Sequence, residues 1–88
     1  MFSKTVTLAY KSKPNLDGKT TYIEFVGITK NWKEREFFYA ACKLTDYNPM
    51  LITIDKKRWR KVRKDKADLM KVYTDTMQEL YDKAKNGI

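Results

Sequence analysis

Apolar and polar residues alternate along the first third of the chain. Within residues 4–12, every second residue from Val6 to Tyr10 is apolar and the neighbours are threonine or alanine, as in a half-buried strand. A proline and a glycine within residues 14–18 predict a turn. Residues 20–29 are rich in β-branched and aromatic side chains, which favour a return strand. This pattern predicts a β-hairpin.

Residues 35–45 fit two secondary structures. Phe37, Phe38 and Tyr39 favour a strand, whereas Glu34 to Leu44 would also make a short helix. We favour the strand, because a third strand lets the hairpin bury one face and residues 45–49 form a natural loop to the next strand. Residues 50–54 then make a short apolar fourth strand.

After residue 54 the apolar residues recur at steps of three and four, which predicts helix. Asp55 is a good N-cap. A gap in the pattern at Lys66, together with a second possible cap at Asp65, allows either one long helix or two short ones. Asn86-Gly87-Ile88 is typical of a Schellman end.

These elements predict an α+β fold in which a four-stranded antiparallel sheet is followed by one long or two short C-terminal helices. A chain of 88 residues has the size of a single domain. Residues 1–54 form its sheet part, and residues 55–86 form a helical part that is first basic and then amphipathic.

The charge of the chain is concentrated in one run. Eight bases and one acid lie between Lys56 and Lys66, so the run has a formal charge of +7 where the whole chain has +8. Like charges at steps of three and four destabilise a helix, so the run favours a polyanionic partner over a solvated surface. Trp59 and Val62 are expected to face the sheet. The candidate phosphate-binding residues are Lys56, Lys57, Arg58, Arg60, Lys61, Arg63, Lys64 and Lys66.

Several chemistries lack the residues they need. The chain has no histidine, one cysteine and three scattered glycines. Catalysis by Ser-His-Asp or Cys-His groups, zinc sites built on histidine or four thiolates, and glycine-rich phosphate loops are therefore excluded. We expect no enzymatic activity, no cofactor and no metal, and we expect Cys42 to be a small buried hydrophobic residue.

The same composition bears on location. No apolar run approaches the length of a membrane span, the N-terminus does not resemble a secretory signal, and a lone cysteine fits a reducing compartment. We therefore expect a cytoplasmic protein with no membrane partner.

Aromatic residues make up 14% of the chain, and many fall on or beside the proposed strands. Neighbouring strand residues point to opposite faces, and one helical layer covers one face. Some rings are therefore expected to be exposed, where the bases of a single strand can stack on them. The candidate stacking residues are Tyr22, Trp32, Phe37 and Tyr39.

Residues 50–62 (Met-Leu-Ile-Thr-Ile-Asp-Lys-Lys-Arg-Trp-Arg-Lys-Val) resemble the strand-to-helix junction of the transcriptional positive cofactor four family. In that family a tryptophan lies a few residues into the helix, as Trp59 does here, and residues 21–25 resemble the family's aromatic-rich strand. The resemblance covers about residues 20–63. It implies a four-stranded sheet, a C-terminal helix, a dimer and binding of single-stranded DNA. It also implies that Lys11, Lys13 and Lys19 follow the phosphates of the bound strand.

The expected function is non-catalytic binding of nucleic acid, with single strands favoured, in transcription or replication. An apolar stripe that includes Leu69, Tyr73, Met77 and Leu80 supplies a possible homodimer contact or packs on its own sheet. The alternative is a small effector, of the kind phages and mobile elements encode, that binds an acidic host protein. A third reading is a small basic ribonuclease, although the toxins of that kind resemble helices followed by sheet, which is the reverse of the order here.

Overall fold

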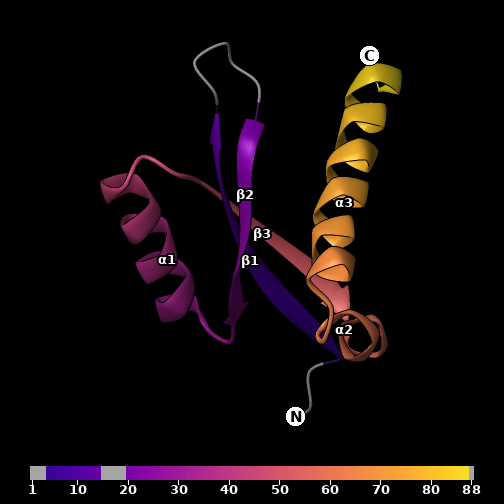
Figure 1. The fold of residues 1–88 in the computed structure, drawn as a ribbon, viewed down its shortest axis with the longest axis horizontal. Helices are drawn as coiled ribbons and strands as arrows, with labels where there is room; N and C mark the ends of the chain where they lie inside the picture. The colour runs from indigo at the N-terminus through magenta and orange to yellow at the C-terminus, as the bar shows by residue number, and fades with distance from the viewer. Residues whose placement is uncertain (1–3, 15–19, 88) are drawn as a thin grey trace.

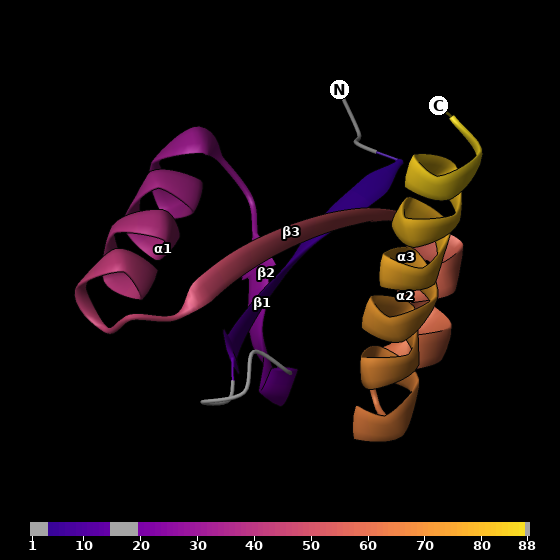
Figure 2. The same cartoon turned by 90° about the horizontal axis from the view of Figure 1, so that it is seen from above.

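The structure, a computed structural model, describes residues 4–14 and 20–87. These residues fold as a small twisted sheet with a helix on one face and a pair of helices on the other, as Figures 1 and 2 show. Along the chain the described elements are β1 (Thr5–Pro14), β2 (Thr20–Thr29), α1 (Trp32–Leu44), β3 (Asn48–Asp55), α2 (Lys56–Val62) and α3 (Lys66–Asn86).

The sheet has β1 at its centre, paired antiparallel with β2 on one side and with β3 on the other. The predicted hairpin is confirmed by the β1–β2 pairing, and the last predicted strand is confirmed as β3. Tyr10 illustrates the register, because it lies opposite Phe25 on β2 and opposite Met50 on β3. All three side chains thereby reach the same core.

The edge strand β2 contains a bulge. Ala9 pairs with Gly27 and Tyr10 pairs with Phe25, so Val26 is an extra residue between the two pairs. Gly27 has a φ of +153°, a backbone conformation that side-chain-bearing residues rarely adopt. A bulge increases the local twist and disrupts the edge of a sheet.

The prediction of a strand at residues 35–45 is wrong, and the sheet of the described residues has three strands where four were expected. The segment belongs to α1. Asn31 caps this helix by accepting a hydrogen bond from the Glu34 N–H at 3.0 Å, and the Glu34 carboxylate accepts from the Lys30 N–H. Two amide groups at the helix start are thereby satisfied. Phe38 and Cys42, one helical turn apart, are buried, so capping and packing together outweigh the β-propensity of three consecutive aromatic residues.

The C-terminal region forms two helices, and both predicted caps are confirmed. Asp55 accepts from the Arg58 N–H at 2.9 Å at the start of α2, and Asp65 accepts from the Ala67 N–H at 2.8 Å at the start of α3. The predicted Schellman end is wrong. Gly87 has a φ of −89°, and its N–H donates to the Lys83 carbonyl at 2.8 Å, so the helix ends on an ordinary helical bond that needs no left-handed residue.

The larger core lies between the sheet and the α2–α3 pair. Tyr10 is fully buried in it, and its hydroxyl donates to the Leu69 carbonyl of α3 at 2.7 Å. This bond ties the central strand to the long helix. The buried members of this core are Leu8, Tyr10, Ile52, Ile54, Val72 and Tyr73.

The smaller core lies between α1 and the opposite face of the sheet. Its buried members are Ala9, Phe38 and Cys42, with Tyr47 and Leu51 packed against them. Ala9 presents only a methyl group to α1. This side of the sheet therefore buries much less apolar surface than the other.

Candidate nucleic-acid interface

The basic run begins with α2, a short helix held against the larger core. Trp59 and Val62 are half-buried and pack against that core, as expected. The Trp59 and Phe25 rings lie with their centroids 6.1 Å apart. In addition, the Lys56 N–H donates to the Lys4 carbonyl at 3.0 Å, which fastens the start of α2 to the start of β1. The cations of α2 are thus carried by a docked helix.

Most of the run faces solvent. Lys56 is half-buried, whereas the other cations of the run are exposed. An exposed cation keeps its hydration until a phosphate replaces it, so its contribution to binding comes mainly from the release of counterions. The exposed cations of the run are Lys57, Arg58, Arg60, Lys61, Arg63, Lys64 and Lys66.

The tertiary structure brings acids beside part of the run, which the sequence pattern did not indicate. Arg58 and Lys61 share a concave surface with Asp68 and Asp75 of α3. Arg58 Nη2 lies 3.8 Å from Asp75 Oδ2, a long and half-exposed ion pair of small energetic value. Arg58 is accordingly less available to an anion than the cations that follow it.

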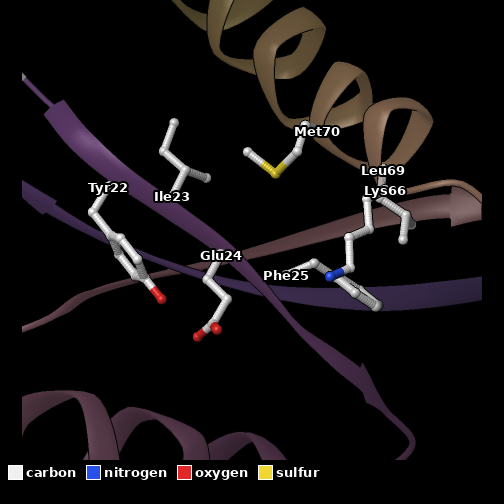
Figure 3. Close-up of a pocket in the computed structure, with 7 residues that line it drawn as sticks. All are labelled: Tyr22, Ile23, Glu24, Phe25, Lys66, Leu69 and Met70. Carbon is white, nitrogen blue, oxygen red and sulfur yellow. The ribbon is translucent and has the colours of Figure 1, made fainter.

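The end of the run reaches a pocket of about 360 Å³ between α3 and the edge strand β2. Lys66 and Met70 extend from α3 towards β2 (Figure 3). On β2, Ile23 points towards the helix, while Tyr22 and Glu24 point the other way, around the strand edge. The pocket thus has apolar walls and an ammonium group on its helix side, and an aromatic ring and a carboxylate at the edge of β2.

Lys11 and Tyr22 lie towards the hairpin end of the sheet, away from the start of α2. Lys11 Nζ is 3.1 Å from Glu24 Oε2 and 4.6 Å from the centroid of the Tyr47 ring. Its hydrogen bond to Glu24 lowers the pKa of that carboxyl and raises the pKa of Lys11 itself. Lys11 therefore already has a carboxylate partner.

The exposed Lys13 extends over the same Tyr47 ring at 5.5 Å, and the Tyr22 and Tyr47 rings lie 5.8 Å apart. Tyr47, which follows α1, did not figure in the sequence prediction, because only the folding of β3 against β1 brings it beneath these lysines. Lys19, the third lysine implied by the family resemblance, lies outside the described residues.

The other candidate stacking residues lie on α1 and not on or beside a strand, which corrects their predicted placement. Trp32, Phe37 and Tyr39 have 69%, 77% and 45% of their surface exposed. They are far along the chain from α2 and on the opposite face of the sheet from α3. The predicted site is therefore divided between a cationic end and an aromatic helix.

Two further features of the described residues concern metal binding and the one cysteine. The described residues contain no cluster of three or more cysteine, aspartate or glutamate side chains that could hold a metal ion. Burial raises the pKa of the Cys42 thiol, which opposes its use as a nucleophile. Within the same part of the chain no helix has the length and apolar character needed to cross a membrane.

Comparison of the chain with known protein families, curated proteins and solved structures gave no match. The four-stranded sheet that the resemblance to the positive cofactor four family implied is not what the described residues form. The chain's own residues are therefore the basis for assigning its function.

Proposed function

We propose that this chain is a non-catalytic nucleic-acid-binding protein that contacts phosphates through the basic run of residues 56–66. The observation that carries the proposal is the exposure of Lys57, Arg60, Arg63 and Lys64 on a helix and turn that Trp59 anchors to the core. Among the described residues these four cations have no acidic partner. A docked cationic surface binds phosphates with less loss of conformational entropy than a mobile tail.

Single strands are the favoured ligand. The pocket at Lys66 joins the end of the basic run to Tyr22, a residue that is 42% exposed. A strand that follows the run and passes around the edge of β2 can place a phosphate at Lys66 and an unpaired base against this ring, whereas the bases of a duplex are stacked on one another and unavailable. The same pocket accepts a base of DNA or of RNA.

The first test removes cations from the run and from a matched control surface. Replacing Arg60, Arg63 and Lys64 with alanine should weaken oligonucleotide binding about a hundredfold at 0.1 M salt and reduce the salt slope by about 2–3. The control replaces Lys43, Lys83 and Lys85, three exposed lysines outside the run, and changes the net charge equally. Equal affinities of the two triple variants in a salt-titrated binding assay would rule the run out as the site.

The second test concerns strandedness. Tyr22→Ala should weaken binding of single-stranded oligonucleotides about tenfold, the value of one stacked base, and leave duplex binding unchanged. Tyr81→Ala is the matched control, since Tyr81 is 64% exposed on the far end of α3. A loss of the same size for single strands and duplexes would show that Tyr22 does not stack on a base.

A protein-binding effector is the second candidate function, and the exposed apolar residues of α1 favour it. Leu44 is 87% exposed and Phe37 is 77% exposed, so these two apolar side chains contribute little to packing on the sheet and are available to a partner. A tagged chain that retains an acidic host protein after nuclease digestion, and loses it on replacement of Phe37 and Leu44 with serine, would support this function.

The surface available for a homodimer contact lies on the second half of α3. Tyr73 and Leu69 of the apolar stripe are buried in the chain's own core, whereas Met77 and Leu80 are 37% and 49% exposed. A dimer contact would use the exposed pair. Sedimentation equilibrium of the wild type and of a Met77→Gln, Leu80→Gln variant measures this directly, and equal monomeric masses would remove the dimer from the proposal.

A further inference from the structure

Three cations outside the exposed part of the basic run meet at one end of the sheet. Here β2 ends, β1 begins and β3 passes into α2, and a pocket of about 310 Å³ lies among these ends and α1. Lys30, Arg35 and Lys56 line it, together with threonines of β1 and β2, and none of the described residues that line it is acidic. Lys30 and Arg35 carry no signal in the sequence pattern, because only the packing of α1 on the sheet brings them to Lys56.

Arg35 is held in place by hydroxyl groups. Its Nε donates to Thr29 Oγ1 at 3.4 Å and its Nη2 donates to Thr7 Oγ1 at 3.1 Å. Thr29 is only 9% exposed, and Thr7 Oγ1 is in turn 3.2 Å from Thr53 Oγ1. Hydrogen bonds that fix a side chain reduce the entropy it loses when a ligand binds.

The orientation of these bonds leaves half of the guanidinium group available. Nε and Nη2 lie along one edge of the planar group, and this edge meets the threonines. The other edge, formed by Nη1 and the second N–H of Nη2, has no protein partner among the described residues. Nη1 keeps some contact with solvent, since no fully buried side-chain nitrogen in that part of the chain lacks a hydrogen-bond partner. A free edge of this kind is the geometry that binds two oxygens of a phosphate.

The charge balance of the pocket also points to an anion. The ion pairs of the described residues join Lys11 to Glu24 and Arg58 to Asp75, and neither reaches this pocket. The nearby Glu34 carboxylate accepts from the Lys30 backbone N–H and lines the neighbouring groove instead. A half-buried guanidinium without a carboxylate partner is costly for folding alone, and an incoming anion offsets that cost.

We propose that this pocket binds one phosphate group, with the free edge of Arg35 donating to two of its oxygens and with Lys30 and Lys56 as flanking cations. Lys56 is the first residue of the basic run, so a strand bound along α2 can continue into the pocket. In that respect the inference rests on the proposed function. The phosphate is an internal or a terminal phosphate of the strand, or free phosphate.

The test uses variants at Arg35 and Lys30 with a neighbouring control. Arg35→Gln keeps a donor for the threonines but loses the charge and should weaken oligonucleotide binding about tenfold; Arg35→Lys keeps the charge without the planar fork and should have a smaller effect. Lys30→Ala, whose side chain is exposed, should lower the salt slope by about 1. Lys33→Gln is the control, because Lys33 lines the adjacent groove and not this pocket.

Three oligonucleotides of one sequence, with a 5′-phosphate, a 3′-phosphate or neither, distinguish an internal phosphate of the strand from a terminal one. An internal phosphate predicts the same Arg35→Gln loss for all three, and a terminal phosphate predicts a loss confined to one. The inference is overturned if Arg35→Gln and Lys30→Ala bind all three oligonucleotides like the wild type. Arg35 would then serve only to hold α1 on the sheet through its hydrogen bonds to Thr29 and Thr7. If the α2 triple variant nevertheless binds weakly, the proposed function survives that outcome.

If the wild-type chain binds no oligonucleotide, titration with inorganic phosphate still tests the pocket. Amide shifts in nuclear magnetic resonance spectra should then move at Thr7, Thr29 and Arg35 and should be lost in Arg35→Gln. Unmoved amides in the wild type would contradict the pocket itself.

Discussion

The two faces of the sheet differ in how completely their helices cover them. On the face of α2 and α3, Leu8 and Tyr10 are fully buried and Val72 is 1% exposed. On the face of α1, Ala9 contributes only a methyl group, and a groove of about 450 Å³ lies open between α1 and β2. The first face supplies the stability of the fold, and the second retains apolar rings and a polar pocket that folding does not need.

The largest effect should come from truncating a side chain of the larger core. Leu8→Ala should lower the free energy of unfolding by about 3–4 kcal/mol, because the cavity that the substitution leaves lies in the centre of the sheet and cannot collapse. Phe38→Ala removes more atoms but borders the open groove, so we expect a loss of about 2 kcal/mol. Urea denaturation measures both, and a larger loss for Phe38→Ala would reverse the comparison of the two faces.

Alkaline pH should destabilise the larger core through Tyr10. Burial raises the pKa of Tyr10 from 10.0 to about 12, so the unfolded chain releases the phenol proton before the folded chain does. Stability due to this group is present below pH 10 and is lost as pH rises towards 12, by roughly 2–3 kcal/mol in all. Thermal melts from pH 9 to 12 measure the loss. Tyr10→Phe keeps the ring without the titrating group and should flatten the profile; an unchanged slope would assign the effect to another residue.

Removal of a helix cap should have a smaller effect that differs between the faces. Asn31→Ala and Asp65→Ala each remove one side-chain acceptor at a helix start, at a cost of about 1 kcal/mol. Since α1 is held by few buried residues, Asn31→Ala should increase amide hydrogen exchange throughout α1. Asp65→Ala should increase amide hydrogen exchange only in the first turn of α3, because the buried Leu69 holds the helix against the larger core. Exchange of equal extent in both helices would show that α1 is as firmly packed as α3.

The smallest effect on stability should come from the pair Lys11–Glu24, which is partly exposed on the hairpin. Glu24→Gln should leave the melting temperature unchanged within error, because surface ion pairs contribute little. It should strengthen oligonucleotide binding slightly at low salt, since Lys11 loses its carboxylate partner. No gain in affinity at any salt concentration would indicate that Lys11 does not lie on the path of the bound strand.

Helices and strands were predicted correctly from the sequence where the different local patterns, such as alternation and helix caps, indicate the same structure. Alternation predicted the hairpin, and the carboxylates of Asp55 and Asp65 predicted two helix starts, because an N-cap acts within one helical turn. At residues 35–45 two local signals conflicted. The aromatic run favoured a strand, while Asn31 followed by Glu34 is a capping pattern that indicates a helix and that the prediction overlooked.

The concentration of charge in residues 56–66 and the absence of histidine are properties of the sequence alone, because they depend only on which residues are present. Which cations remain available was decided by tertiary structure. Asp75 is 17 positions from Arg58, and no local pattern relates these two residues. Lys11 and Glu24 are paired by the strand register of the hairpin. The meeting of Lys30, Arg35 and Lys56 is non-local, since it requires α1 to pack across the ends of three strands. Composition therefore determined that the chain is cationic, and the packing of α1 and α3 on the sheet decided where its unpaired charge is presented.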